Sequence, residues 1–407
     1  MKIKICRLCK SKFFSNLFSL GNLSYTGKFA SKVSEDIPKK KIAIVMCKKC
    51  KLVQLDRNFN PKYLYAKDYG YRTGINKTMT QHVKNVVISS RRKVNLKKND
   101  FVLDIASNDG TLLNFYKNNV IKVGIDPILD KYKIFYNNVD HKVNDFFSYE
   151  ALKKKHINNK FKIITALSVF YDLKTPNKFV KDIKKILEIN GVFVLEHADL
   201  LSILKNNLFD TICHEHLEYY SSKVIIEIMK KNNLRVFDLK KNNINGGSIR
   251  YYISHNDSKF KSNKKIINQI LMEEKKYKLQ LPKTFKNFEK NLINIKKKLK
   301  NLISKIKKQN KKIHGYGAST KGNVLLQYFN ITKKDIDYIA DRNPKKYNKY
   351  APGTKIKIIS EKKSRKIKPD YYLVLPWHFK KEIIKREKLT IKRGTKLIFP
   401  LPKMNIV

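Results

Sequence analysis

Short apolar runs alternate with stretches of helical periodicity between residues 100 and 253. Apolar residues that recur every three to four positions predict helices, whereas uninterrupted apolar runs bounded by polar turns predict buried strands. Strands are expected at 101–105, 123–126, 161–166, 191–196, 234–239 and 248–253, with a further one ending near residue 144. This alternation is typical of a doubly wound α/β sheet, and the Asn-Gly-Gly turn at 245–247 predicts a hairpin between the last two strands.

The pattern changes after residue 260. Residues 261–312 are rich in lysine but keep an apolar seam, which predicts helix broken near Pro282. The seam consists of Phe285, Phe288, Leu292, Ile295, Leu299, Leu302 and Ile306. We expect it to pack on a neighbouring element of the chain; contact with a second copy is the alternative, so both monomer and homodimer fit the sequence. A second α/β unit follows, with strands expected from residue 312 and at 336–341, 371–377 and 396–399.

Four of the five cysteines form two Cys-x-x-Cys pairs, Cys6 with Cys9 and Cys47 with Cys50. Each pair follows a short strand-like run, so each can form a knuckle, and two knuckles supply the tetrahedral four-sulfur shell that zinc prefers. Four ordinary buried or redox-active cysteines are the alternative, but a thioredoxin-like pair would be single and would open a helix. We therefore predict a structural zinc site.

A chain of 407 residues is too long for one compact core. The patterns above divide it into a zinc-binding domain (1–72), a central α/β domain (73–255), and a helical connector with a second Rossmann-like α/β domain (256–407).

The net charge of +56 comes mainly from lysines spread along the whole chain. A basic surface can attract nucleic acid or smaller anions such as nucleotide sugars. Because the lysines are dispersed, accompany many asparagines and outnumber arginine heavily, AT-rich codon usage explains them better than a nucleic-acid interface. We expect no nucleic-acid partner. The sequence also lacks a signal-peptide pattern and an apolar run long enough for a membrane helix, so we expect a cytoplasmic protein without membrane contact.

The first strand of the central domain runs into a polar turn of small residues, which can bring backbone amides close to a ligand. Asp126 ends the next strand, where a carboxylate can accept hydrogen bonds from ribose hydroxyls. The spacing of the turn differs from the dinucleotide pattern GxGxxG and favours S-adenosylmethionine (SAM) over NAD. The predicted cofactor-binding residues are Asp104, Ala106, Asn108, Gly110, Asp126, Asn144 and Asp145.

Residues 210–221 hold two histidines, three carboxylates and two tyrosines, a composition suited to proton transfer. Any one of these histidines alone would be read as structural, but three adjacent titratable groups at 214–216 favour catalysis. Tyr69, Tyr71 and Arg72 lie at the junction of the first two domains, where they can line a cleft or simply pack. The second glycine turn, 315–317, leads to Lys321, which is suited to bind a phosphate or another anion.

These motifs resemble the sugar C-methyltransferases of deoxysugar pathways and their relatives in bacterial surface-polysaccharide clusters, over essentially the whole chain. The matching segments are the two cysteine pairs and residues 104–113, 210–216, 245–248, 317–322, 341–344 and 375–377. The resemblance implies an N-terminal zinc domain, a central class I SAM-methyltransferase domain of Rossmann-like fold, and a C-terminal Rossmann-like domain, with a nucleotide-linked 4-keto sugar bound between them.

The resemblance also implies roles for individual residues. His216 matches the base that removes a proton next to the C4 ketone, so that the enolate carbon can attack the methyl group of SAM. Glu215 is the alternative base or orients it, and His214 and Tyr71 complete the predicted catalytic set. Tyr69, Arg72, Tyr219 and Lys321 are the predicted substrate-binding residues.

Two positions depart from the family pattern. Cys213 stands where antibiotic-pathway members have tyrosine, and Tyr171 and Asp172 stand where they have histidine. Tyr219 or Tyr220 could compensate for the lost tyrosine. The departures leave open the sugar, the carbon that is methylated, and oxygen rather than carbon attack. A SAM-dependent O-methyltransferase, an NAD-linked oxidoreductase using the turn at 315–317, and a zinc-ribbon nucleic-acid binder are the alternatives.

Overall fold

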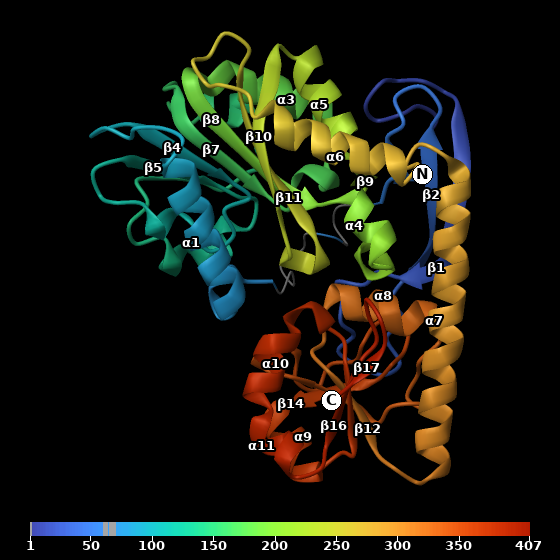
Figure 1. The fold of residues 1–407 in the computed structure, drawn as a ribbon. Coiled ribbons are helices and arrows are strands. Elements are labelled where there is room, and N and C mark those ends of the chain that lie inside the picture. The colour runs from blue at the N-terminus through green and yellow to red at the C-terminus, as the bar shows by residue number, and fades with distance from the viewer. Residues whose placement is uncertain (1, 60–63, 65–70) are drawn as a thin grey trace.

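The computed structural model describes residues 2–59, 64 and 71–407, and the strands within these ranges form three sheets (Figure 1). Tyr69, one of the predicted substrate-binding residues, lies outside the described residues.

The N-terminal sheet is antiparallel, with the order β1-β2-β3-β9. Its strands are β1 (Phe14–Ser24), β2 (Lys39–Cys47), β3 (Val53–Leu55) and β9 (Glu218–Tyr219). The last of these comes from the middle of the chain: Gln54 pairs with Glu218 and Val53 with Tyr219. The titratable segment 210–221 is thus part of the N-terminal sheet as well as of the central domain.

The central sheet has the order β10-β11-β8-β7-β4-β5-β6. Its strands are β4 (Phe101–Ile105), β5 (Ile121–Ile125), β6 (His141–Val143), β7 (Phe161–Leu167), β8 (Leu187–Ala198), β10 (Leu234–Asn242) and β11 (Ser248–His255). Pairing is parallel except that β11 runs antiparallel to both β8 and β10. The predicted strands and the closing hairpin are confirmed.

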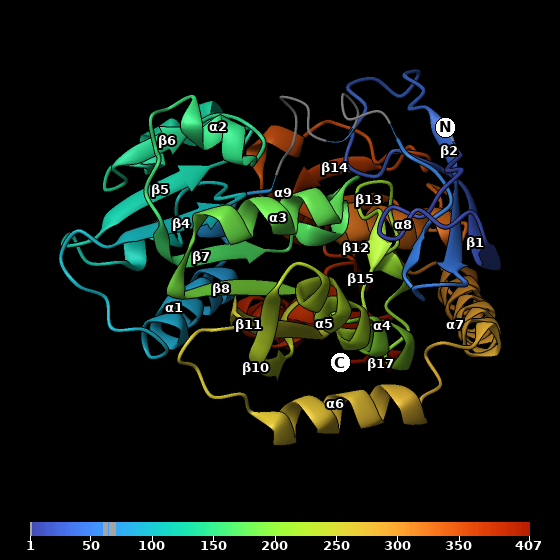
Figure 2. The ribbon, with the colours of Figure 1, turned by 90° about the horizontal axis from the view of Figure 1, so that it is seen from above.

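Helices cover both faces of the central sheet (Figure 2). They are α1 (Lys77–Arg91), α2 (Tyr149–Lys153), α3 (Pro176–Ile186), α5 (Ser222–Lys231) and α6 (Lys264–Lys276). Helix α4 (Leu200–Lys205) packs instead in the core that includes residues of the N- and C-terminal domains. The hairpin between β10 and β11 reaches toward the C-terminal domain. A Cβ at Gly246, where φ is +93°, would lie 2.7 Å from the Trp377 ring, so this close approach requires glycine.

The C-terminal sheet has the order β14-β13-β12-β15-β16-β17 and is parallel except for β17. Its strands are β12 (Ile313–Tyr316), β13 (Tyr338–Asp341), β14 (Lys357–Ser360), β15 (Tyr371–Val374), β16 (Lys396–Phe399) and β17 (Asn405–Ile406). Its helices are α8 (Thr320–Tyr328), α9 (Glu361–Ile367), α10 (Lys380–Arg386) and α11 (Lys388–Lys392). Strand β14 escaped the sequence analysis because it is short and follows alternating lysines.

Helix α7 (Pro282–Lys308) runs alongside β1 and continues down the C-terminal domain (Figure 1). Most of the predicted seam is buried, and Ile295 and Leu302 are partly buried against the same core. The seam therefore packs within the chain, as expected. Among the described residues, no helix is both long and apolar enough to cross a membrane.

The N-terminal and C-terminal domains are joined directly. Ala30 forms an antiparallel bridge with Tyr350. The Gln327 amide accepts a hydrogen bond from the Ser24 nitrogen (2.7 Å) and donates to its carbonyl (3.2 Å). Asn323 donates to the Thr26 carbonyl at 2.7 Å. These bonds place the loop around residue 27 beside the start of α8, facing the central domain.

Candidate active site

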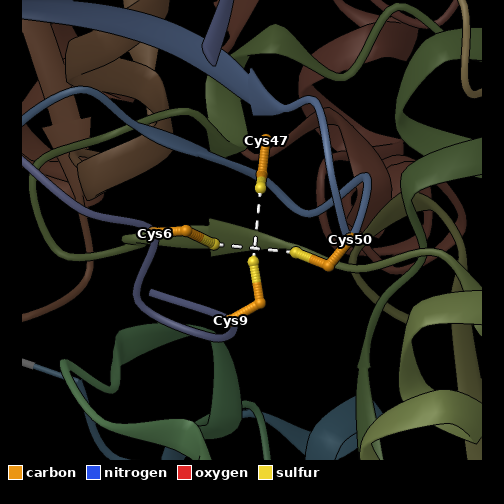
Figure 3. Close-up of side chains that lie close together, drawn as sticks. All are labelled: Cys6, Cys9, Cys47 and Cys50. Atoms are coloured by element: carbon orange, nitrogen blue, oxygen red, sulfur yellow. Dashed lines mark hydrogen bonds between the residues drawn. The ribbon is translucent and has the colours of Figure 1, made fainter. Parts of the chain in front are cut away.

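The four paired cysteines converge on one point, with their sulfur atoms directed inward (Figure 3). The Sγ atoms lie 3.6 Å apart for Cys6 and Cys50 and 3.4 Å apart for Cys9 and Cys47, and all four are within 4.8 Å of one another. A tetrahedral zinc with Zn–S bonds of about 2.3 Å needs sulfurs about 3.8 Å apart. The cluster therefore fits a closed, structural zinc site.

A cleft of about 560 Å³ lies between the three domains. It opens at the carboxyl ends of β4, β5 and β7 and faces the turn that follows β12. In open α/β sheets, ligands bind at this edge of the strands. Its lining includes Gly27 and Phe29 from the N-terminal domain, the turn after β4, Glu215 and His216, and Lys321, Arg342 and His378 from the C-terminal domain.

Asp104, Ala106, Asn108 and Asp126 line the half of the cleft formed by the central domain. The turn was expected to offer backbone amides to the ligand, but most are used internally. Ala106 and Ser107 donate to the Ile125 carbonyl, and Asn108 donates to the Asp126 carboxylate at 2.9 Å. Positive φ values at Ala106 (56°) and Asn108 (53°) direct these amides toward β5. These three amides are therefore not available to a ligand in the cleft.

The two acidic residues of this half are buried. Burial raises the pKa of Asp104 to about 7, although Thr165 donates to it at 2.6 Å and favours the ionised form. Burial also raises the pKa of Asp126, while backbone hydrogen bonds from Ile128 and Asn108 lower it. Both groups line the cleft near the carboxyl ends of β4 and β5.

The other predicted cofactor residues lie outside the cleft lining. Gly110 packs under the Tyr136 ring, which a Cβ would approach to 3.2 Å. The Asn144 amide donates to the Asp130 carboxylate (2.5 Å), and Asp145 accepts from the Phe146 nitrogen (2.7 Å). Phe146 itself lines the cleft and is 57% exposed. At this end of β6 the exposed ring of Phe146, rather than the polar side chains of Asn144 and Asp145, therefore lines the cleft.

Tyr71 and Arg72 line the cleft at the start of a loop that is held by the turn after β4. Asn108 accepts a hydrogen bond from the Thr73 nitrogen (2.9 Å). The Arg72 Nε lies 3.4 Å from an Asp109 oxygen, and the guanidinium stacks 4.2 Å from the centre of the Phe135 ring. Arg72 therefore already has an anionic partner, which limits its predicted role as a phosphate fork.

His216 lines the cleft as a partly buried, neutral imidazole. Its Nδ1 donates to the Thr211 carbonyl at 2.7 Å, which fixes the tautomer and leaves Nε2 as the basic nitrogen. The pKa of His216 is lowered to about 4, mainly by burial; the Thr211 hydrogen bond opposes this shift and the nearby Lys321 ammonium adds to it. Its ring lies 4.3 Å from the ring of Tyr171, which also lines the cleft.

Glu215 lines the cleft beside His216, whereas His214 and Tyr219 point into the N-terminal domain. Burial raises the pKa of Glu215 to about 7, and the Cys213 thiol donates to it at 3.5 Å. His214 is fully buried between the Tyr25 and Phe59 rings, and Tyr219 donates to the His216 carbonyl at 2.9 Å. Residues 214–219 lie between the cleft and the N-terminal core, so some of their side chains face the cleft and others face that core.

Lys321 lines the C-terminal wall of the cleft, as predicted for an anion-binding residue. Burial lowers its pKa, which the buried carboxylate of Asp210 partly offsets. Asp210 in turn accepts a hydrogen bond from the Trp377 indole at 2.8 Å. His378 also lines the cleft; its position was not predicted, although the preceding Trp377 belongs to a matching motif.

Gly27 sits against the catalytic segment. A Cβ at this position would lie 2.6 Å from Oε1 of Glu215 and 3.9 Å from Oγ1 of Thr320. We expect Gly27→Ala to destabilise the protein by about 1–3 kcal/mol through overpacking and to lower methyl-transfer activity by displacing Glu215. Thermal unfolding and initial rates measure both effects. The double variant Gly27→Ala/Glu215→Asp should recover stability, because the shorter carboxylate relieves the clash; a wild-type melting temperature for Gly27→Ala would contradict this packing.

Family models match the three domains separately. They are described as a "zinc binding domain" (residues 6–65), a "Methyltransferase domain" (residues 79–239) and a "C-methyltransferase C-terminal domain" (residues 243–402). The chain is a SAM-dependent methyltransferase. The match to a C-methyltransferase C-terminal domain covers residues 243–402, and the match to a zinc binding domain agrees with the cysteine geometry.

The methyltransferase is also similar to curated and solved proteins. It is 24% identical over 409 residues to the C-methyltransferase NovU of Streptomyces niveus, a match that covers 99% of this chain and 96% of NovU. A SAM-dependent methyltransferase from Clostridium acetobutylicum is 14% identical, covering 43% of this chain and 92% of its own, with a TM-score of 0.35. The YcgJ protein of Bacillus subtilis is also 14% identical, covering 42% and 95%, with a TM-score of 0.32.

Proposed function

We propose that this methyltransferase transfers the methyl group of SAM to a carbon atom next to the ketone of a nucleotide-linked 4-keto sugar. The observation that carries the proposal is His216, which lines the cleft between the central and C-terminal domains and whose Nδ1–H is held by the Thr211 carbonyl, so that Nε2 is the basic nitrogen. A base is needed for carbon methylation because the carbon must first lose a proton. The C-methyltransferase domain match and the likeness to NovU support the same reaction.

His216 would begin the reaction by taking the proton from the carbon next to the ketone. The electron pair of that C–H bond would then form the enolate. Bound SAM would supply a methyl group to the enolate carbon, with the new C–C bond replacing the S–CH₃ bond and the ketone restored. The proton leaves from Nε2 of His216 to solvent. Burial and the charge of Lys321 keep the imidazole of His216 neutral, so that it can accept a proton at neutral pH.

The developing enolate oxygen needs a donor or a cation nearby. Lys321 is close enough to lower the pKa of His216, so its ammonium group is suited to this role. The Tyr171 hydroxyl is a second candidate, because its ring lies against His216 and at the cleft surface. Tyr171 would then replace the tyrosine that Cys213 displaces, a role that Tyr219 and Tyr220 cannot fill while their hydroxyls bond the His216 carbonyl and Glu218.

The nucleotide part is expected on the C-terminal wall. Lys321, Arg342 and Lys346 line that side of the cleft at the start of α8 and after β13. Two of these cations have acidic neighbours: Lys346 lies 3.8 Å from Asp341, and Arg342 lies 3.7 Å from Glu382. A diphosphate that enters would compete with these carboxylates for the same cations, which suits reversible binding.

The experiment that tests the proposal incubates the zinc-loaded protein in deuterated water with a panel of nucleotide 4-keto sugars, with and without SAM. We expect deuterium at one ring carbon without SAM and a methyl group at the same carbon with it, both followed by mass spectrometry. The matched control is the same sugar reduced at C4 with borohydride, which should be inert. Methylation of the reduced sugar at oxygen would replace the proposal with O-methylation.

The pH dependence of methyl transfer distinguishes the two candidate bases. The base must be unprotonated, so the rate falls as the pH drops through its pKa. With His216 as the base, at a pKa of about 4, we expect kcat/KM to stay flat between pH 6 and pH 8. With Glu215 as the base, the rate would fall about tenfold per pH unit below its pKa of about 7. The Glu215→Gln variant serves as the control, because it removes the second titration.

A further inference from the structure

Arg7, the residue between Cys6 and Leu8 in the first cysteine knuckle, is only 4% exposed and reaches from the metal site to the catalytic segment. Its guanidinium donates to the carbonyls of Leu55 (2.8 Å), Arg57 (2.9 Å) and Leu217 (3.4 Å), and to the side chains of Asn58 (2.8 Å) and Gln54 (3.2 Å). Burying a guanidinium is costly unless its donors are satisfied, and here every nitrogen has a partner. These hydrogen bonds are concentrated where β3 meets β9.

Gln54 connects the same arginine to the metal ligands. Its amide nitrogen donates to the Cys6 sulfur at 3.2 Å, while its oxygen accepts from both the backbone nitrogen and the guanidinium of Arg7. Groups that hydrogen-bond to metal ligands set the orientation of those ligands. A contiguous set of bonds therefore runs from the metal-binding sulfur through Gln54 and Arg7 to the carbonyl of Leu217.

Leu217 is the residue after His216, and its carbonyl is fixed from two sides. The Leu55 nitrogen donates to it at 2.9 Å as part of the β3–β9 contact, and Arg7 donates at 3.4 Å. The next residue, Glu218, is also buried; burial raises the pKa of its carboxyl group, and the nearby Arg7 guanidinium opposes that rise. The backbone that carries His216 is thus anchored on its far side to the cysteine knuckle.

We propose that Arg7 and Gln54 are positioning residues that couple the metal-bound geometry of the cysteine knuckle to the orientation of His216. The inference rests on the proposed role of His216 as the base. Arg7 itself has no contact with the cleft in the lining described above. The zinc site then has a function beyond holding its own domain together, because it sets the backbone position of the group that removes the proton.

The test compares Arg7→Gln with Arg57→Gln, an arginine of the same domain whose side chain pairs with Asp56 at 2.7 Å and whose backbone carbonyl is kept. Zinc content, SAM affinity, hydrogen exchange of backbone amides in residues 216–220, and kcat and KM are measured for both. For Arg7→Gln we expect one bound zinc, SAM affinity within about threefold of wild type, amide exchange at least about tenfold faster, and kcat lowered at least about tenfold with KM little changed. Arg57→Gln should match wild type in all four.

Wild-type exchange in residues 216–220 of Arg7→Gln would overturn the inference, and so would the loss of SAM affinity together with activity, since that is a general loss of structure. If Arg7→Gln does not fold, the Arg7→Lys variant is used instead, because lysine keeps the positive charge but not the forked donor of the guanidinium. Faster amide exchange in Arg7→Lys with zinc retained supports the coupling. Loss of zinc from Arg7→Lys overturns it. The exchange and zinc measurements need no sugar, so failure of the 4-keto sugar reaction would leave them fully interpretable.

Discussion

Replacing His216 with glutamine is expected to abolish methyl transfer and leave SAM binding intact. Glutamine keeps a neutral polar side chain of similar size beside the Thr211 carbonyl, while the basic ring nitrogen is lost. General bases typically contribute 10²–10⁴-fold, and we expect kcat to fall about 1,000-fold. Deuterium exchange of the 4-keto sugar without SAM should fall in parallel, because the same nitrogen performs both steps.

Calorimetry with SAM and mass spectrometry of the sugar measure the two halves of this prediction. The matched control is His141→Gln, an exposed histidine on β6 that should retain full activity. Residual exchange at the wild-type rate in His216→Gln would assign the base to another group, with Glu215 the next candidate because burial holds its pKa at about 7.

Replacing Cys47 with serine is expected to release zinc and to remove activity without removing the cofactor site. Structural zinc contributes on the order of 10 kcal/mol to small metal-bound domains, far more than one side chain can compensate. The N-terminal sheet holds β9, so its loss frees the backbone next to His216, whereas the turn after β4 belongs to the central sheet. Activity should drop below detection while SAM still binds.

Metal analysis, calorimetry and hydrogen exchange measure these outcomes. Cys213→Ser is the matched control, since Cys213 lies outside the four-cysteine cluster and its loss should leave one zinc per chain. Full activity of a zinc-free Cys47→Ser protein would show that the metal site does not support the catalytic segment.

Regular periodicity made the central domain predictable. Its strands are mainly apolar runs such as Phe161–Leu167, in which Lys162 and Thr165 are the polar positions, and burial on both faces of a parallel sheet favours that pattern. The cysteine knuckles were equally clear, because zinc coordination limits the spacing of its ligands. The apolar seam of α7 was also predictable, because its buried positions follow the helical repeat.

The finer assignment of side chains was not predictable from local sequence. His214 and His216 have similar neighbours in the chain, yet only His216 lines the cleft. Which of the two faces the cleft depends on the pairing of β9 with β3, and β9 is too short to show a periodic pattern. Arg72 was expected to be available for a phosphate, but Asp109, brought near by folding, already pairs with it. His378 comes from the C-terminal domain, and no local sequence pattern shows how that domain packs against the cleft.

The mid-chain origin of β9 affects how the protein can fold during synthesis. Strand β3 ends at Leu55, but its partner begins only at Glu218. At ordinary translation rates the ribosome needs on the order of ten seconds to make the chain between them. Throughout that interval β3 is an unpaired edge, the kind of surface that recruits foreign strands. Early capture of zinc by the two cysteine pairs would hold the nascent sheet together until its own last strand emerges.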